Sequence, residues 1–150
     1  MNSRVLAAVA SIGASALLVP AALSAQKQAV IPAGMSASAT LTPGIRNGNT
    51  LYVSGQLGVS RQAPDSTIEG QTKKSLENIQ KVVEAAGAHM SDVTKCTVFL
   101  ANLKDFAGMN SAYSQMFPKE PPARSTVVVA ALVSPAAKVE IECIAAIPPK

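Results

Sequence analysis

The stretch PPARSTVVV, residues 121–129, decides how this chain folds. Its two prolines restrict the approaching backbone, and the β-branched run after them predicts a buried strand. Arg124 stands at the mouth of that strand, where a guanidinium loses part of its water. Such a group needs an anionic partner, and its planar fork suits a carboxylate. The alternative is a rim arginine whose head reaches solvent, and the pattern alone leaves both interpretations open.

A second informative strand is predicted downstream, at residues 138–146. Successive side chains of a strand point to opposite faces, so Val139 and Cys143 share one face while Glu140 and Glu142 share the other. A carboxylate facing inward from so apolar a strand is costly unless it is paired or has a function. The alternative is a row of acidic side chains facing solvent on an open sheet.

The remaining elements follow from the spacing of apolar residues. Alternation and β-branching predict strands, spacings of three and four predict helices, and Asn47-Gly48 predicts a hairpin turn. The predicted order is strand 41–49, strand 50–56, helix 68–86, strand 93–100, a helix beginning near residue 106, strand 125–132 and strand 138–146.

This order predicts an α+β fold in which two helices cover one face of a sheet. A chain of this length has no third layer for the other face. We therefore expect the open face to be covered by oligomerisation.

The N-terminus is expected to lie outside the fold. Residues 1–25 have a charged start, an apolar centre and small residues near Ser24 and Ala25, the layout of a secretory signal peptide. A membrane anchor is the alternative, but the apolar run is short and interrupted. We expect a flexible segment at 26–38, a folded domain at 39–150, and a periplasmic or secreted protein without a stable membrane anchor after cleavage.

Charge and cysteine content narrow the function classes. The net charge is +4, but the basic residues are scattered and not interleaved with aromatics, so no nucleic-acid surface is predicted. Cys96 and Cys143 lie far apart in strand-like contexts. An oxidising compartment permits a disulfide, although we favour two free buried thiols. His89, the single histidine, is expected at the surface, so neither a metal site nor a Ser-His triad is predicted.

Four segments, taken in order, resemble the RidA (YjgF-like) family of imine and enamine deaminases. They are LYVSGQ at 51–56, SLENI at 75–79 with EAAG at 84–87, DF at 105–106 with NSAY at 110–113, and PARS at 122–125 followed by VEIE at 139–142. No single segment is diagnostic, but the ordered set covers nearly all of the mature domain.

The resemblance implies a chorismate-mutase-like fold that assembles as a homotrimeric barrel, with sites in clefts between subunits. It also implies hydrolysis of 2-imino acids and their enamine tautomers, such as 2-aminoacrylate, to 2-keto acids and ammonia. Neither a cofactor nor a metal is implied.

The resemblance also implies roles for individual residues. Arg124 would bind the substrate carboxylate, and Glu140 would orient or deprotonate the attacking water. Ser54 and Gly55 would line the pocket, and Asn110 would support it from the second helix. A non-catalytic trimer that binds keto acids or similar carboxylates is the alternative. Chaperone-like or RNA-cleaving activity, proposed for some relatives, is ranked last.

Three departures from the family pattern concern the wall of the site. Many members have a tyrosine in the stretch that corresponds to Ala39–Leu41, so a hydroxyl is absent here. Many also have cysteine where this chain has Thr126, which keeps a small polar group in the binding site. The loop at 133–137 is one residue longer than in the typical family pattern.

Overall fold

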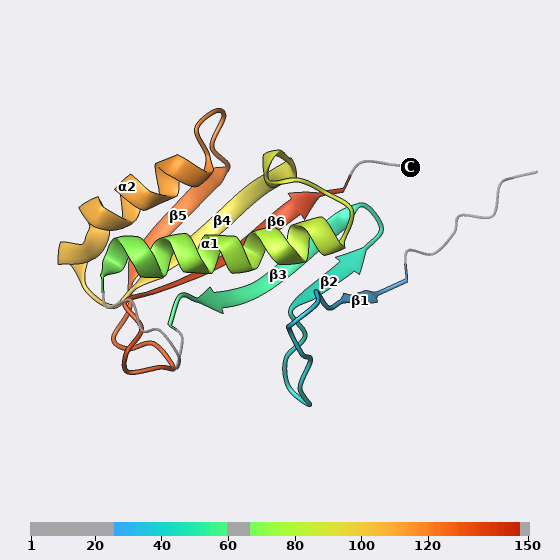
Figure 1. The fold of residues 1–150 in the computed structure, drawn as a ribbon, viewed down its shortest axis with the longest axis horizontal. Helices are drawn as coiled ribbons and strands as arrows, with labels where there is room; N and C mark the ends of the chain where they lie inside the picture. The colour runs from blue at the N-terminus through green and yellow to red at the C-terminus, as the bar shows by residue number, and fades with distance from the viewer. Residues whose placement is uncertain (1–25, 60–66, 148–150) are drawn as a thin grey trace, which may run out of the picture.

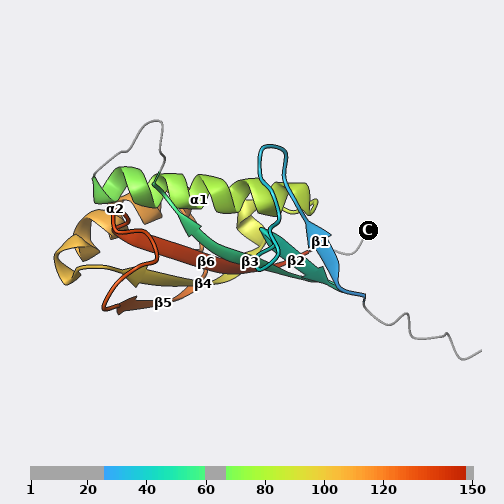
Figure 2. The ribbon, with the colours of Figure 1, turned by 90° about the horizontal axis from the view of Figure 1, so that it is seen from below.

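The computed structural model describes residues 26–59 and 67–147, which form one six-stranded sheet with both helices on one face (Figures 1 and 2). The strand order is β1-β2-β3-β6-β4-β5. Only the β4–β5 pair is parallel, and the other pairs are antiparallel. The predicted α+β class is confirmed, with the helices segregated to one side of a mixed sheet.

The chain alternates strands with two α-helices and two short 3₁₀ helices. In order, these are β1 (Gln28–Val30), β2 (Gly44–Asn47), β3 (Thr50–Leu57), α1 (Ile68–Ala85), η1 (Met90–Asp92), β4 (Val93–Leu100), η2 (Leu103–Asp105), α2 (Phe106–Met116), β5 (Ala123–Val128) and β6 (Val139–Ala146).

Helix α1 matches its prediction to within one residue. Thr67 caps its start, because the side-chain oxygen accepts a hydrogen bond from the Gly70 amide. The helix ends before Gly87, whose φ of +80° suits glycine. Its apolar face, including Leu76 and Ile79, is fully buried against the sheet. No helix in the described part of the chain is long and apolar enough to span a membrane.

The N-terminal region contains a strand that its sequence does not signal. The sequence predicts a flexible segment at 26–38, but β1 pairs there with β2, from Gln28↔Arg46 to Val30↔Gly44. The segment lacks hydrophobic periodicity, so its order comes from the partner strand. The predicted signal peptide, residues 1–25, lies outside the described residues.

Strand β5 differs at both ends from the predicted strand 125–132. It begins at Ala123, so Arg124 lies inside the strand rather than at its mouth. It ends at Val128, which pairs with Leu100, the last residue of β4. The β-branched run continues to Val129, but the partner strand does not.

The preference for free thiols was wrong. Cys96 and Cys143 are directly opposite on β4 and β6, and the structure joins them in a disulfide. Both are at most 2% exposed and lie on the helix-covered face. A separation of 47 residues hides this pairing in the sequence, whereas the strand register makes it plain.

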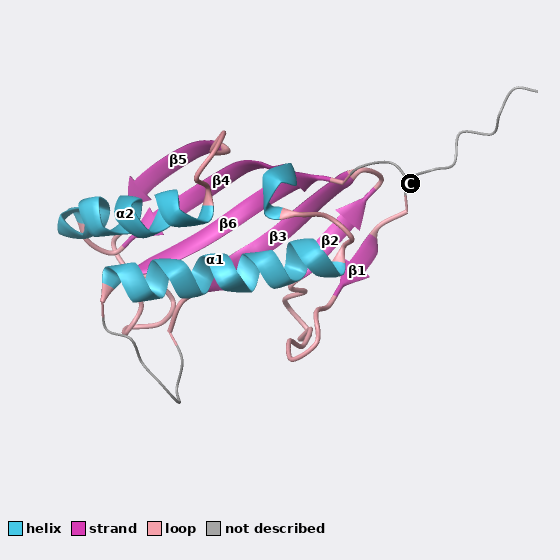
Figure 3. Cartoon of the chain, turned by 45° about the horizontal axis from the view of Figure 1, so that its top comes forward, coloured by secondary structure: helices cyan, strands magenta, loops and turns pink. Residues whose placement is uncertain are grey.

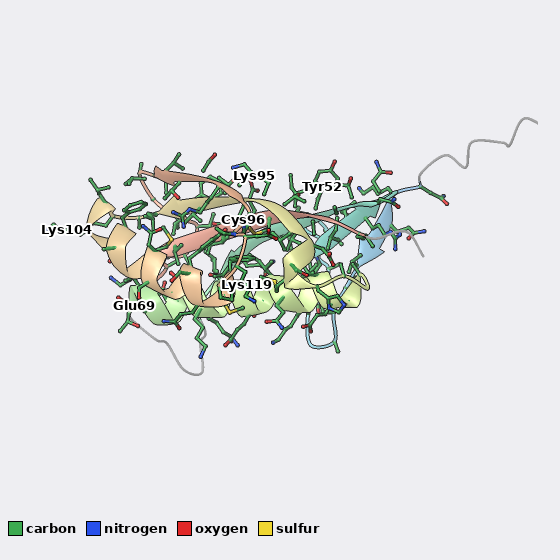
Figure 4. All side chains as sticks on the ribbon, turned by 90° about the horizontal axis from the view of Figure 1, so that it is seen from above. Tyr52, Glu69, Lys95, Cys96, Lys104 and Lys119 are labelled. Carbon is green, nitrogen blue, oxygen red and sulfur yellow. A yellow bond between two sulfur atoms is a disulfide. The ribbon has the colours of Figure 1, made fainter. Side chains whose placement is uncertain are left out.

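The other face of the sheet has no cover within the described chain. Tyr52 is 49% exposed and Val127 is 44% exposed on this side. Figure 4 shows Tyr52 and Lys95 on the side of the sheet away from α1, and Lys95 Nζ donates to Ser125 Oγ at 2.8 Å. We call the side away from the helices the open face.

Candidate functional site

Arg124 lies on the helix-covered side of β5, beside α2. In the parallel β4–β5 pair it is the partner of Cys96, whose side chain is buried under the helices. Its Nη2 donates to Asn110 Oδ1 at 2.7 Å, and its Nη1 points at Met109 Sδ at 3.8 Å. Its Cζ lies 4.7 Å from the centre of the Tyr113 ring. In Figure 3, α2 lies beside β5 on the side of the sheet that the helices cover.

All three contacts of the guanidinium are with uncharged groups. The only ion pair between described residues is Lys74–Glu77, on the surface of α1. Arg124 is only partly exposed, so its charge is partly desolvated, and no described residue provides a counter-ion. A positive group in this state favours an anionic ligand, and two of its five N–H groups already have partners.

A pocket of about 440 Å³ opens beside Arg124. It is lined by Asn110, Tyr113, Ser114, Phe117, Pro121, Pro122 and Arg124. The prolines of the opening motif therefore form one wall, while α2 forms the other. The volume suits a small carboxylic acid with room for water.

Two hydroxyl groups near Arg124 have no hydrogen-bond partner among the described residues, Tyr113 Oη and Thr126 Oγ1. Burial raises the pKa of Tyr113 to about 12, although the charge of Arg124 opposes the shift. The phenol therefore stays neutral at physiological pH. Thr126 shares the helix-covered face of β5, two residues beyond Arg124.

Glu140 lies elsewhere, on the open face of β6, opposite Phe99 of β4. It is half-buried, and its carboxylate has no hydrogen-bond or ion-pair partner among the described residues. Its Oε1 sits over Gly55, where a Cβ atom would overlap it. A register shift between Val53 and Gln56 marks a bulge in β3 at this point. Because Gly55 has no side chain, the Glu140 carboxylate can occupy the space above it.

Ser54 lies next to Gly55 but lines a different hollow. Its Oγ donates to the Thr42 carbonyl at 2.6 Å. The pocket there, of about 400 Å³, is lined by Lys27, Ser38, Ala39, Thr40, Leu41, Thr42, Ile45 and Ser54. Leu41, at the position where the resemblance leads one to expect a tyrosine, is 48% exposed on its wall.

The predicted site residues thus fall into two groups. The first, which we call the arginine half-site, contains Arg124, Asn110 and Thr126 on the helix-covered face of β5 and α2. The second, the glutamate half-site, contains Glu140, Gly55 and Ser54. Strand β4 separates β5 from β6, and Arg124 and Glu140 point to opposite faces of the sheet. One chain does not bring the two charged groups together.

Sequence reasoning missed two members of the arginine half-site, Met109 and Tyr113. Their spacing of three and four along α2 assigns them to the core, and at 0% and 4% exposure they are core residues. They also face Arg124. The available signal was the i,i+3 relation of Tyr113 to Asn110, which places both on one side of the helix. Among the described residues, no cluster of His, Cys, Asp or Glu side chains suits a metal ion.

Comparisons with known proteins give a consistent picture. A family model described as endoribonuclease L-PSP matches residues 32–147. Reactive Intermediate Deaminase A, chloroplastic, from Arabidopsis thaliana is 42% identical over 104 residues, covering 67% of this chain and 55% of that protein. The chain thus spans little more than half of that relative's length.

Two further similarities have higher coverage of the other protein. A Dermatophagoides farinae protein named 2-iminobutanoate/2-iminopropanoate deaminase is 41% identical over 106 residues, 69% of this chain and 82% of that protein. The crystal structure of the YjgF gene product from E. coli matches with a TM-score of 0.72 at 34% identity, covering 79% of this chain and 98% of that chain.

Proposed function

The chain belongs to the endoribonuclease L-PSP family, with a YjgF-like fold, and from this premise we propose that it hydrolyses 2-imino acids to 2-keto acids and ammonia. Relatives named as deaminases of reactive intermediates and of 2-iminobutanoate support an imine deaminase in general. The observation that carries the proposal is Arg124, a partly buried guanidinium whose partners among the described residues are all uncharged and which opens on a pocket of about 440 Å³.

The chemistry needs little beyond positioning and one base. Arg124 holds the substrate carboxylate through N–H groups that Asn110 and Met109 leave unused. The protonated imine carbon is already electrophilic. Glu140 takes a proton from water as the water oxygen bonds to the imine carbon. Glu140 then returns that proton to the amine nitrogen, the C–N bond breaks to release ammonia, and the hydroxyl group loses its proton as the keto group forms.

The two half-sites lie on opposite faces of one sheet, so the proposal requires two copies of the chain. In a homotrimer, the arginine half-site of one copy would meet the glutamate half-site of its neighbour. The uncovered open face, with Tyr52 and Val127 exposed, supports such an assembly. The substrate would bind in the cleft between neighbouring copies.

The disulfide supports a location outside the cytoplasm. Disulfides persist in oxidising compartments and are rare where thiols are kept reduced. Together with the apolar N-terminal stretch of the sequence, Cys96–Cys143 favours a periplasmic or secreted protein.

A second candidate function is carboxylate binding without turnover. It is favoured by Leu41, which gives the hollow beside Ser54 an apolar wall where a hydroxyl was expected. In this case Arg124 would still bind keto acids, but the chain would not speed imine hydrolysis above the rate in buffer.

The experiment that tests the proposal supplies imines continuously with an amino acid oxidase and measures keto acid release. We expect Arg124→Ala to lower kcat/KM by about 100-fold or more, because the carboxylate loses its charged anchor. Glu140→Gln should lower kcat by about 100-fold.

Gly55→Ala provides a matched probe, since it changes no charged group. Its Cβ would displace the Glu140 carboxylate, so kcat should fall. The double variant Gly55→Ala/Glu140→Gln should have the same kcat as Glu140→Gln alone, because both substitutions act on the same carboxylate. If the Arg124→Ala protein hydrolyses imines as fast as wild type, the proposal is wrong. Saturable keto-acid binding without hydrolysis would select the second candidate.

A further inference from the structure

Tyr113 occupies a position that its role in the core does not explain. It is 4% exposed, yet its ring lies 4.7 Å from the Arg124 guanidinium carbon, and it lines the pocket. The Phe117 ring packs against it, with centroids 4.9 Å apart and the planes tilted by 40°. Because one aromatic ring holds the other, the surface beneath Arg124 is fixed.

The other contacts of Arg124 fix its position but not its plane. Asn110 Oδ1 binds one terminal nitrogen, and Met109 Sδ faces the other. The remaining link, through Nε, is a flexible side chain, so the guanidinium can still rock about the line through its two tips. A ring under its face opposes this motion, since a cation is attracted to the face of an aromatic ring.

We propose that Tyr113 is a positioning residue of the carboxylate site, its ring setting the plane of the Arg124 guanidinium so that the unused N–H groups face the pocket. The nature of the ligand rests on the proposed function, whereas the contact between ring and guanidinium does not. Tyr113 acts through Arg124 and need not touch the ligand.

The hydroxyl group is not needed for this role, but its neutral state is compatible with it. A phenolate beside Arg124 would form an internal ion pair and compete with an anionic ligand. Burial disfavours that charged form and raises the pKa of Tyr113 to about 12. The ring therefore offers its face to Arg124 while leaving the positive charge for the pocket.

Two substitutions separate the ring from the hydroxyl. Tyr113→Phe keeps the ring and removes a hydroxyl that has no partner among the described residues. Tyr113→Leu removes the ring but keeps an apolar side chain in the core. With 2-oxobutanoate as the calorimetric probe, we expect affinity within about twofold of wild type for Tyr113→Phe and about 5- to 30-fold weaker for Tyr113→Leu.

Two further measurements exclude a merely structural effect. In an Arg124→Ala background, Tyr113→Leu should weaken binding no further, because Tyr113 acts through the guanidinium. In the ligand-free protein, a proton–nitrogen correlation NMR spectrum should show that the Tyr113 ring current changes the chemical shifts of the Arg124 guanidinium protons. Tyr113→Phe should keep this shift and Tyr113→Leu should abolish it.

The outcomes distinguish this inference from the proposed function. Unchanged affinity in Tyr113→Leu, an equal loss in Tyr113→Phe, or a further loss in the Arg124→Ala background would each overturn the role of the ring. If wild type neither binds 2-oxobutanoate nor hydrolyses imines, the proposed function fails. The NMR comparison then still decides whether Tyr113 orients Arg124, since it needs no ligand.

Discussion

At the scale of single residues, the site is built around the positive charge of Arg124. Its contacts with described residues fix its position but do not neutralise the charge. Arg124 contacts an amide oxygen, a thioether and a neutral ring. A carboxylate in any of these positions would have provided a counter-ion and removed the reason to bind an anion. The uncharged surroundings therefore favour a ligand-binding role over a purely structural one.

The raised pKa of Tyr113 predicts a loss of stability at high pH. The folded protein binds the phenol proton more tightly than the unfolded chain, so stability is complete below pH 10 and falls as pH approaches about 12. We expect this group to contribute about 2 kcal/mol to the decline. The measurement is urea unfolding at pH 9 and pH 11.5 for wild type and Tyr113→Phe. An equal decline in both proteins would contradict it.

Whether a site residue can be predicted from the sequence depends on how much it differs from its neighbours in the chain. Arg124 and Glu140 are charged residues in apolar strands, so both are conspicuous in the sequence itself. Tyr113 lies on the apolar stripe of a helix. Its place on that stripe predicts a core residue and gives no sign of its contact with Arg124. That Arg124 and Glu140 lie on opposite faces cannot be read from either strand alone, because the face depends on pairing register.

At the scale of elements, the disulfide joins the neighbouring interior strands β4 and β6. Strand β6 carries Glu140, and β4 pairs with β5, which carries Arg124. The bond therefore fixes the register of β6, which holds the glutamate half-site, against β4, and β4 in turn sets the register of β5 through their pairing. A slip of one residue in either pair would turn a charged group to the wrong face.

Loss of this bond should lower stability more than activity. Cys96→Ala with Cys143→Ala should reduce the free energy of unfolding by about 3 kcal/mol, because the bond closes a long loop in the unfolded chain. Urea unfolding with and without a reducing agent provides the measurement. Wild type should be sensitive to the reductant and the double variant insensitive. Equal stability of oxidised and reduced wild type would refute this expectation.

Element types are predictable from the sequence, whereas some boundaries are not. The period of α1 and the alternation of β4 are properties of their own sequences, and both elements match their predicted ranges closely. The end of β5 is set by its neighbour, since β4 stops at Leu100 while the valine run continues. The strand β1 likewise exists through pairing with β2, which no local pattern records.

At the scale of the whole molecule, the proposed trimer would have each chain contribute one half-site to each of two different sites. The proposed trimer predicts that inactive chains can complement each other. Arg124→Ala retains the glutamate half-site, and Glu140→Ala retains the arginine half-site. In a random mixture of equal amounts, about a quarter of the interfaces would pair two intact halves.

Co-expression of these two variants should therefore restore about a quarter of wild-type activity, measured on purified mixed trimers. The matched control pairs Arg124→Ala with Asn110→Ala. Both substitutions damage the arginine half-site, so every interface stays defective and the mixture should gain nothing. Activity no higher in the first mixture than in the second would show that the site is not shared between chains.

The Cys96–Cys143 bond also has a consequence for chemical self-damage. These are the only two cysteines in the sequence, and both sulfur atoms are committed to each other inside the core. The carbon of a protonated imine is electrophilic and can add a thiolate, which is the strongest nucleophile that a side chain ordinarily offers. This chain has Thr126 near its arginine and no free thiol among the described residues, so a reactive substrate bound at the proposed site would meet no thiolate.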